Sequence, residues 1–168
     1  MRLVRLAAVL LAVTLIAACA SSGAVPKPFP GSPEASPPAA PPAPRTDAAS
    51  IVKDALALRG VPYRNGGTDP KGFDCSGLVQ YVFAKHGVTL PRGTREQLDH
   101  GTEVRLAAIA PGDLIFFSTT ASKEASHVGV AIGGDEFVHA PSSRGRVRVE
   151  KFSAPYWSRR IVGVRRLR

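Results

Sequence analysis

The sequence predicts an α+β domain over residues 46–168, with helices packed on one face of an antiparallel sheet of about five strands. Two observations lead to this prediction. The first part of the domain has apolar residues at helical spacing, between capping residues and glycines. After Pro111-Gly112 the pattern changes to short β-branched or alternating runs that are separated by turns. Helices followed by strands are typical of the α+β class, and the chain has no internal repeat.

Two helices are expected in the first part of the domain, each between a capping residue and a glycine. Thr46 or Asp47 can accept the first free N–H groups of a helix that ends at Gly60. The second helix is expected to begin near Asp74-Cys75 and to end at Gly87. The loop between the two helices is rich in glycine and other turn-forming residues.

A short third helix and five strands complete the expected elements. Thr94 and Gln97 have the spacing of a capping box, which predicts a helix that ends at Gly101. The strands are expected at residues 113–117, 127–132, 136–140, 146–150 and 161–167. These runs are separated by turns, and the sheet that they form is expected to be antiparallel.

The N-terminal segment has the pattern of a bacterial export signal. Arg2 and Arg5 precede an apolar run, Leu6 to Ala18, which is too short to span a bilayer. Small residues lead directly into Cys19, and this ending resembles a lipobox. The resemblance implies that residues 1–18 are a signal peptide and that Cys19 is cleaved free and lipidated. We therefore expect a lipid anchor on the periplasmic side of the envelope, in the outer membrane, because no aspartate follows the cysteine.

Residues 19–45 are expected to be a linker between this anchor and the domain. Nine of the chain's 15 prolines lie in this segment, which favours an extended, partly polyproline II conformation.

The net charge of the whole chain, +9, favours an anionic binding partner. Because the chain is expected to be exported, a cell-wall polymer or membrane surface fits better than nucleic acid. Charges that only form a solvated face are the alternative.

Cys75 is the main candidate for covalent chemistry. The chain has two cysteines, and lipidation of Cys19 leaves Cys75 as a lone thiol in an oxidising compartment. At the predicted start of a helix, backbone N–H groups favour the thiolate, and the N–H of Cys75 itself is a candidate oxyanion donor. An imidazolium at His127 is a further source of stabilisation. A buried packing cysteine is the alternative.

His127 and His139 lie in consecutive predicted strands that form a hairpin. A three-residue loop at Gly133-Gly134-Asp135 pairs Gly129 with His139 and places both histidines on the same face of the sheet. A two-residue loop would place them on opposite faces. The same-face arrangement lets His139 orient the ring of His127 while His127 faces Cys75, as in thiol hydrolases.

Six motifs along the domain resemble the NlpC-type family of cell-wall peptidases. They are Gly-Val-Pro-Tyr-Arg-Asn-Gly-Gly at 60–67, Phe-Asp-Cys-Ser-Gly-Leu-Val at 73–79, Leu-Pro-Arg at 90–92, Pro-Gly-Asp-Leu-Ile-Phe-Phe at 111–117, Ser-His-Val-Gly-Val at 126–130 and Phe-Val-His-Ala-Pro at 137–141. The resemblance covers nearly all of residues 48–168, in the family's order. It implies a papain-like fold. It also implies an enzyme that cleaves peptide stems of peptidoglycan and needs no metal or other cofactor.

The resemblance also implies roles for six residues. By position, the nucleophile, the base and the orienting third residue are Cys75, His127 and His139. Tyr63 resembles a tyrosine that lies close to the nucleophile. Asp74 and Ser76 resemble a pair that binds the free amine of a stem peptide in some members.

Several alternatives stay open at this point. The bond cut is either the D-glutamyl–diaminopimelate bond of the stem or the D-alanyl–diaminopimelate cross-bridge. A non-catalytic wall-binding lipoprotein and a thiol amidase or acyltransferase with another substrate are rival functions. A zinc site built from Cys75, His127 and His139 is disfavoured, because no closely spaced ligand pair is present.

His86 and His100 are interpreted as surface caps at helix ends. We expect a monomer that binds no nucleic acid.

Overall fold

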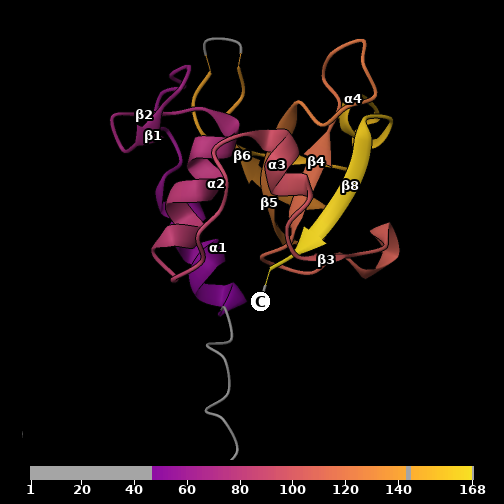
Figure 1. The fold of residues 1–168 in the computed structure, drawn as a ribbon, viewed down its shortest axis with the longest axis horizontal. Coiled ribbons are helices and arrows are strands. Elements are labelled where there is room, and N and C mark those ends of the chain that lie inside the picture. Colours follow the sequence, from indigo (N-terminus) through magenta and orange to yellow (C-terminus); the bar gives the residue numbers. More distant parts are fainter. Residues whose placement is uncertain (1–46, 143–144, 168) are drawn as a thin grey trace, which may run out of the picture. The chain divides into compact units, whose positions relative to one another are not determined.

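The computed structural model describes residues 47–142 and 145–167 (Figure 1). The expected signal peptide at residues 1–18, the lipidation site Cys19 and the linker at 19–45 lie outside the described residues. Within the described part, no helix has the length and apolar character needed to cross a membrane. The helices are α1 (Ala48–Ala57), α2 (Cys75–Ala84), α3 (Thr94–Leu98) and α4 (Pro155–Ser158), with a 3₁₀ turn at Leu106–Ala108.

Both long helices begin as the sequence predicts. Asp47 is the N-cap of α1, and its carboxylate accepts a hydrogen bond from the N–H of Ala49 at 3.1 Å. Asp74 caps α2 in the same way, with 2.8 Å between its Oδ1 and the nitrogen of Gly77. Cys75 is therefore the first residue of α2. The local sequence alone was enough to place this thiol at a helix start.

The predicted capping box of the third helix is wrong. The N-cap of α3 is Gly93, and no side chain caps this end. The expected partner Gln97 is fully buried, and its amide donates to the carbonyls of Ser76 at 3.1 Å and Pro91 at 2.9 Å. Because Gln97 makes these tertiary contacts, it is not available to bond its own helix start, and Thr94 is the first residue of the helix.

A six-stranded antiparallel sheet confirms the α+β class. In spatial order its strands are β3 (Thr102–Glu103), β8 (Ile161–Arg166), β4 (Leu114–Phe117), β5 (His127–Gly133), β6 (Glu136–His139) and β7 (Arg148–Lys151). All five expected strands are present. The sixth, β3, has only two residues and pairs with the outer edge of β8. A separate two-stranded sheet is formed by β1 (Thr68–Asp69) and β2 (Gly72–Phe73).

Two hydrophobic cores lie on opposite faces of this sheet. In the first, α1 and α2 cover β5 (Figure 1). Leu78 of α2 is buried in the same cluster as Val128 and Val130. In the second, Trp157 of α4 packs with Phe117 at a centroid distance of 4.7 Å. The expectation that the helices lie on one face holds for the first three, whereas α4 covers the other face. Its single turn was too short to be found from periodicity.

The β5–β6 hairpin reaches the predicted register by a different route. Gly133 pairs with Glu136, so the turn has two residues and not three. The register then shifts by one between Ala131 and Gly133, and further along the hairpin Val130 pairs with Val138. This is the pairing that a three-residue loop would have produced. A β-bulge thus supplies the extra residue and keeps the two histidines on one face.

Candidate active site

His127 and His139 form a hydrogen-bonded pair on one face of the hairpin. The Nε2 atom of His127 lies 2.8 Å from the Nδ1 atom of His139, and the rings are nearly perpendicular. Both side chains are buried, at 4% and 0% exposure. The predicted same-face arrangement is confirmed. Because Nε2 of His127 is engaged by His139, its Nδ1 atom is the nitrogen left to act on a proton.

Aromatic side chains hold the His127 ring in place. The indole of Trp157 stacks on it, with 5.4 Å between the ring centroids and 26° between the planes. Phe117 lies at 6.2 Å from the same ring. Trp157 is the chain's single tryptophan, and its place in the site was not foreseen. It lies 30 residues after His127 on an element that the sequence did not reveal.

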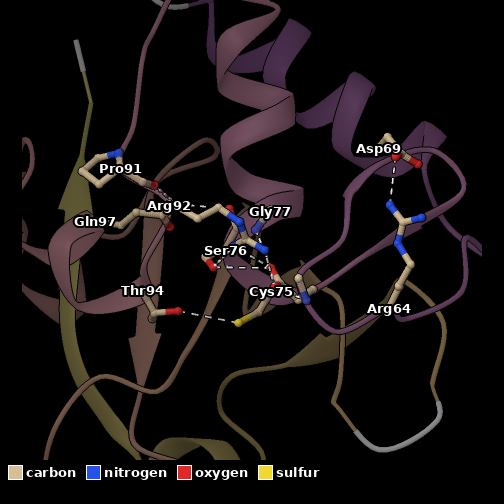
Figure 2. A network of polar contacts seen from close by, with 11 residues as sticks. Arg64, Asp69, Cys75, Ser76, Gly77, Pro91, Arg92, Thr94 and Gln97 are labelled. Carbon is tan, nitrogen blue, oxygen red and sulfur yellow. Dashed lines mark hydrogen bonds and ion pairs between the residues drawn. The ribbon is translucent and has the colours of Figure 1, made fainter.

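The thiol of Cys75 lies between α3 and β5. Its sulfur is 3.7 Å from the hydroxyl oxygen of Thr94 (Figure 2). The backbone N–H of Val128, the residue next to His127, favours the ionised thiol and lowers its pKa. The thiol is therefore beside the start of β5. Its side-chain hydrogen bond nevertheless goes to Thr94, and not to His127.

The ionisation of this site differs from the expectation. Burial raises the pKa of the Cys75 thiol, although the hydroxyl of Thr94 opposes that shift. Burial, followed by the charge of His139, lowers the pKa of His127 to about 3. The thiol and the imidazole are therefore both neutral at rest. The expected thiolate–imidazolium pair is wrong for this structure, because burial outweighs the favourable field of the helix start.

The buried histidines predict a loss of stability in mild acid. Burial lowers the pKa of His127 to about 3 and that of His139 to about 4, from an ordinary 6.5. As the pH falls below 6.5, the unfolded chain takes up protons that the folded chain does not. The free energy of unfolding should then fall by up to about 1.4 kcal/mol per pH unit for each histidine.

The measurement is urea unfolding of the wild type and of His139→Asn at pH 7, 6 and 5. The wild type should show the steeper loss, because it has one more buried histidine. Equal slopes for the two proteins would contradict the assignment of a lowered pKa to His139.

Arg92 contacts both members of the expected amine-binding pair, Asp74 and Ser76. Figure 2 shows its guanidinium beside Ser76. The guanidinium donates to both carboxylate oxygens of Asp74, and its Nη1 lies 2.8 Å from the hydroxyl oxygen of Ser76. Asp74 also accepts from the backbone N–H groups of Gly66, at 3.0 Å, and Gly77. A substrate ammonium would have to displace one of these donors. In the sequence, Arg92 is recognisable only as part of the Leu-Pro-Arg motif at 90–92.

Tyr63 lies close to the thiol, as the resemblance implied. Burial raises the pKa of its phenol, and the charges of Cys75 and Asp74 add to this shift. Its backbone N–H donates to the carbonyl of Gly145 at 2.8 Å, which holds the loop before α2 against the loop after β6. Three of the predicted residues, the tyrosine, the aspartate and the cysteine, are thus brought together.

A cavity of about 570 Å³ opens beside His127. Its lining combines the aromatic rings of Tyr156 and Trp157 with the charged side chains of Arg148 and Glu150. Within residues 47–142 and 145–167, no group of three or more His, Cys, Asp or Glu side chains is arranged to hold a metal ion.

The two histidines interpreted as caps lie outside this site. The ring of His86 contacts Asp54 of α1 at 3.1 Å, so it links two helices and does not only cap one. The Nδ1 atom of His100 lies 2.8 Å from the carbonyl oxygen of Glu96, one turn earlier.

Comparisons with known proteins identify a single family. A model described as the NlpC/P60 family matches residues 60–166. The chain is 42% identical over 123 residues to a murein DD-endopeptidase/murein LD-carboxypeptidase, MepS, of Escherichia coli, covering 72% of this chain and 64% of the relative. It is 38% identical over 125 residues to a gamma-DL-glutamyl hydrolase of Bacillus subtilis, covering 73% and 30%. The chain thus spans less than two thirds of both relatives.

A solved structure gives the same result. An NlpC/P60 family protein from Bacillus cereus superimposes with a TM-score of 0.68 at 32% identity, covering 71% of this chain and 39% of that one.

Proposed function

The chain belongs to the NlpC/P60 family, whose papain-like fold it has, and we propose on this basis that it is a cysteine peptidase of peptidoglycan. It hydrolyses peptide stems or the cross-links between them. The observation that supports this most directly is the buried His127–His139 pair on a sheet whose strand β5 begins near the thiol at the start of α2. The names of the two relatives, a murein endopeptidase and a glutamyl hydrolase, support the substrate class.

Catalysis follows a general-base route, because both reacting groups are neutral at rest. The sulfur of Cys75 attacks the scissile carbonyl while Nδ1 of His127 takes the thiol proton. The backbone N–H of Cys75 is positioned at a helix start to stabilise the oxyanion. His127 then donates its proton to the leaving amine, and water hydrolyses the thioester. His139 orients the His127 ring and stabilises its transient charge.

The six residues divide between chemistry and recognition in this proposal. Cys75, His127 and His139 perform the reaction. Tyr63 borders the attacking sulfur, and the Asp74–Ser76 pair contacts the substrate after Arg92 has moved away. The bond cut is the D-glutamyl–diaminopimelate bond or the D-alanyl–diaminopimelate cross-bridge, and one experiment distinguishes them.

That experiment is digestion of purified sacculi by the full-length protein, with the muropeptides separated and identified by mass spectrometry. Cross-bridge cleavage should convert dimers to monomers with complete stems. Cleavage after D-glutamate should leave stems of two residues. Protein that sediments with sacculi but releases nothing would favour a wall-binding role and contradict the proposal. Release of neither product, with hydrolysis of another amide, would favour the amidase alternative.

We propose further that the protein is a lipoprotein. Residues 1–18 act as the signal peptide, Cys19 receives the lipid, and the linker at 19–45 presents domain 46–168 to the wall from the outer membrane. The support is the sequence pattern alone, since these residues lie outside the described part of the chain.

Cys19→Ser is expected to abolish acylation, because the sulfur that receives the lipid is removed. Labelled palmitate and mass spectrometry of the mature N-terminus provide the measurement. Cys75→Ser is the matched control, because it removes the chain's other thiol and should keep the lipid. Wild-type protein without acyl groups would refute the anchor.

A further inference from the structure

His139 has a buried nitrogen without a hydrogen-bond partner. Its Nδ1 faces His127, but its Nε2 is fully buried and makes no hydrogen bond. The carboxylate of Glu150 is close to it, with 3.6 Å between its Oε1 and Nε2 of His139. Glu150 is on β7, where it pairs with Phe137, two residues before His139 on β6. The carboxylate and the imidazole are therefore diagonal neighbours on the same face of the sheet.

The positions of the ring protons decide whether the pair can react. His127 accepts the thiol proton at Nδ1 only if its own proton is on Nε2. That proton must then be donated to Nδ1 of His139, which has to be an unprotonated acceptor. His139 consequently has its proton on Nε2, directed at Glu150. In the opposite arrangement His139 donates from Nδ1, and His127 has its proton on the nitrogen needed for catalysis.

We propose that Glu150 is a positioning residue, whose carboxylate accepts from Nε2 of His139 and so selects the reactive tautomer of both histidines. This inference rests on the proposed peptidase function and deepens it. When His127 takes up the thiol proton, the same carboxylate stabilises the positive charge that the two rings share. The triad thus continues to a fourth side chain.

Other contacts keep Glu150 in position and ionised. The indole N–H of Trp157 donates to its Oε2, and Nε of Arg148 donates to its Oε1. Burial raises the pKa of Glu150, but these hydrogen bonds and the nearby His139 lower it overall. Trp157 therefore has two functions, because it stacks on His127 and also anchors the carboxylate that orients His139.

The direct test is nitrogen-15 NMR of the histidine rings in full-length protein, which distinguishes protonated from bare ring nitrogens. The wild type should have both His127 and His139 protonated at Nε2. Glu150→Leu removes the acceptor, and the population protonated at Nδ1 of His139 should rise. A wild-type spectrum with His139 protonated at Nδ1, or identical tautomers in both proteins, would overturn the proposal.

Kinetics supply the second measurement. Glu150→Gln keeps an oxygen that can accept from Trp157 but removes the negative charge. We expect kcat to fall about 10- to 100-fold with little change in KM. Removal of a side chain that orients a metal-binding histidine has an effect of the same size. Glu136→Gln, at an exposed glutamate of β6, is the matched control and should match the wild type. An unchanged kcat in folded Glu150→Gln would contradict the role.

The two proposals fail in different ways. Because NMR needs no substrate, the tautomers can be assigned even if the protein releases no muropeptides. An inactive wild type would end the peptidase proposal. If the wild type is active but its histidine tautomers are the same in Glu150→Leu, only the proposed role of Glu150 is refuted.

Discussion

Cys75→Ala and Cys75→Ser are expected to release no muropeptides from sacculi. Alanine has no nucleophile, and a serine hydroxyl is far harder to deprotonate than a thiol. The neutral imidazole of His127 is too weak a base to offset the much higher pKa of a serine hydroxyl. Loss of a nucleophile in a triad costs about 10⁶-fold in rate, so the expected remaining activity is below detection.

The fold should survive both changes. Cys75 is only partly buried at the edge of the first core, and the cap of α2 is made by Asp74 and not by the thiol. Circular dichroism and thermal melts should therefore match those of the wild type. Cys19→Ser, assayed on isolated sacculi, is the matched control because it replaces the chain's other cysteine, outside the domain, and should keep full activity. Undiminished release by Cys75→Ala would end the thiol mechanism.

His127→Ala is expected to lower kcat about 10²- to 10⁴-fold, because general-base assistance is worth that much. The Nδ1 atom that takes the thiol proton is lost with the ring. The substitution also leaves a cavity against Trp157, so the stability of the variant has to be measured separately. His100→Ala is the matched control, since His100 is exposed and bonds only within its own turn.

The effect of changing His139 should depend on the replacement. His139→Asn and His139→Gln keep an oxygen that can accept from Nε2–H of His127, so they should retain measurable turnover. His139→Ala leaves that buried N–H without a partner and should be slower. Steady-state kinetics of the folded variants provide the comparison. An active His127→Ala together with an inactive His139→Ala would reverse the two roles.

Much of the fold could be predicted because its determinants are local. The cap at Asp74 and the glycine after α2 lie within the segment that they bound, so the position of Cys75 followed from neighbouring residues. The five longer strands were visible as β-branched runs between turns. The two-residue strands β1, β2 and β3 and the four-residue helix α4 were missed, since such short segments contain no periodicity.

The register of the β5–β6 hairpin could not be predicted from the local sequence. The sequence offered two registers for His127 and His139, and loop length was the only criterion between them. The structure has the short loop but the register of the long one, because a bulge before Gly133 compensates. Packing of Val130 and Val138 in the first core favours that register, and this depends on helices distant in the chain.

The sequence by itself determined the residue types of the site: a thiol at a helix start and two histidines in neighbouring strands. Only the tertiary structure decided what surrounds them. Arg92 pairs with Asp74, and Glu150 faces His139 across two strands. Burial also leaves Cys75 and His127 neutral, where a thiolate and an imidazolium were expected. Capping and periodicity act over a few residues, whereas desolvation and ion pairing depend on segments that meet only when the chain folds.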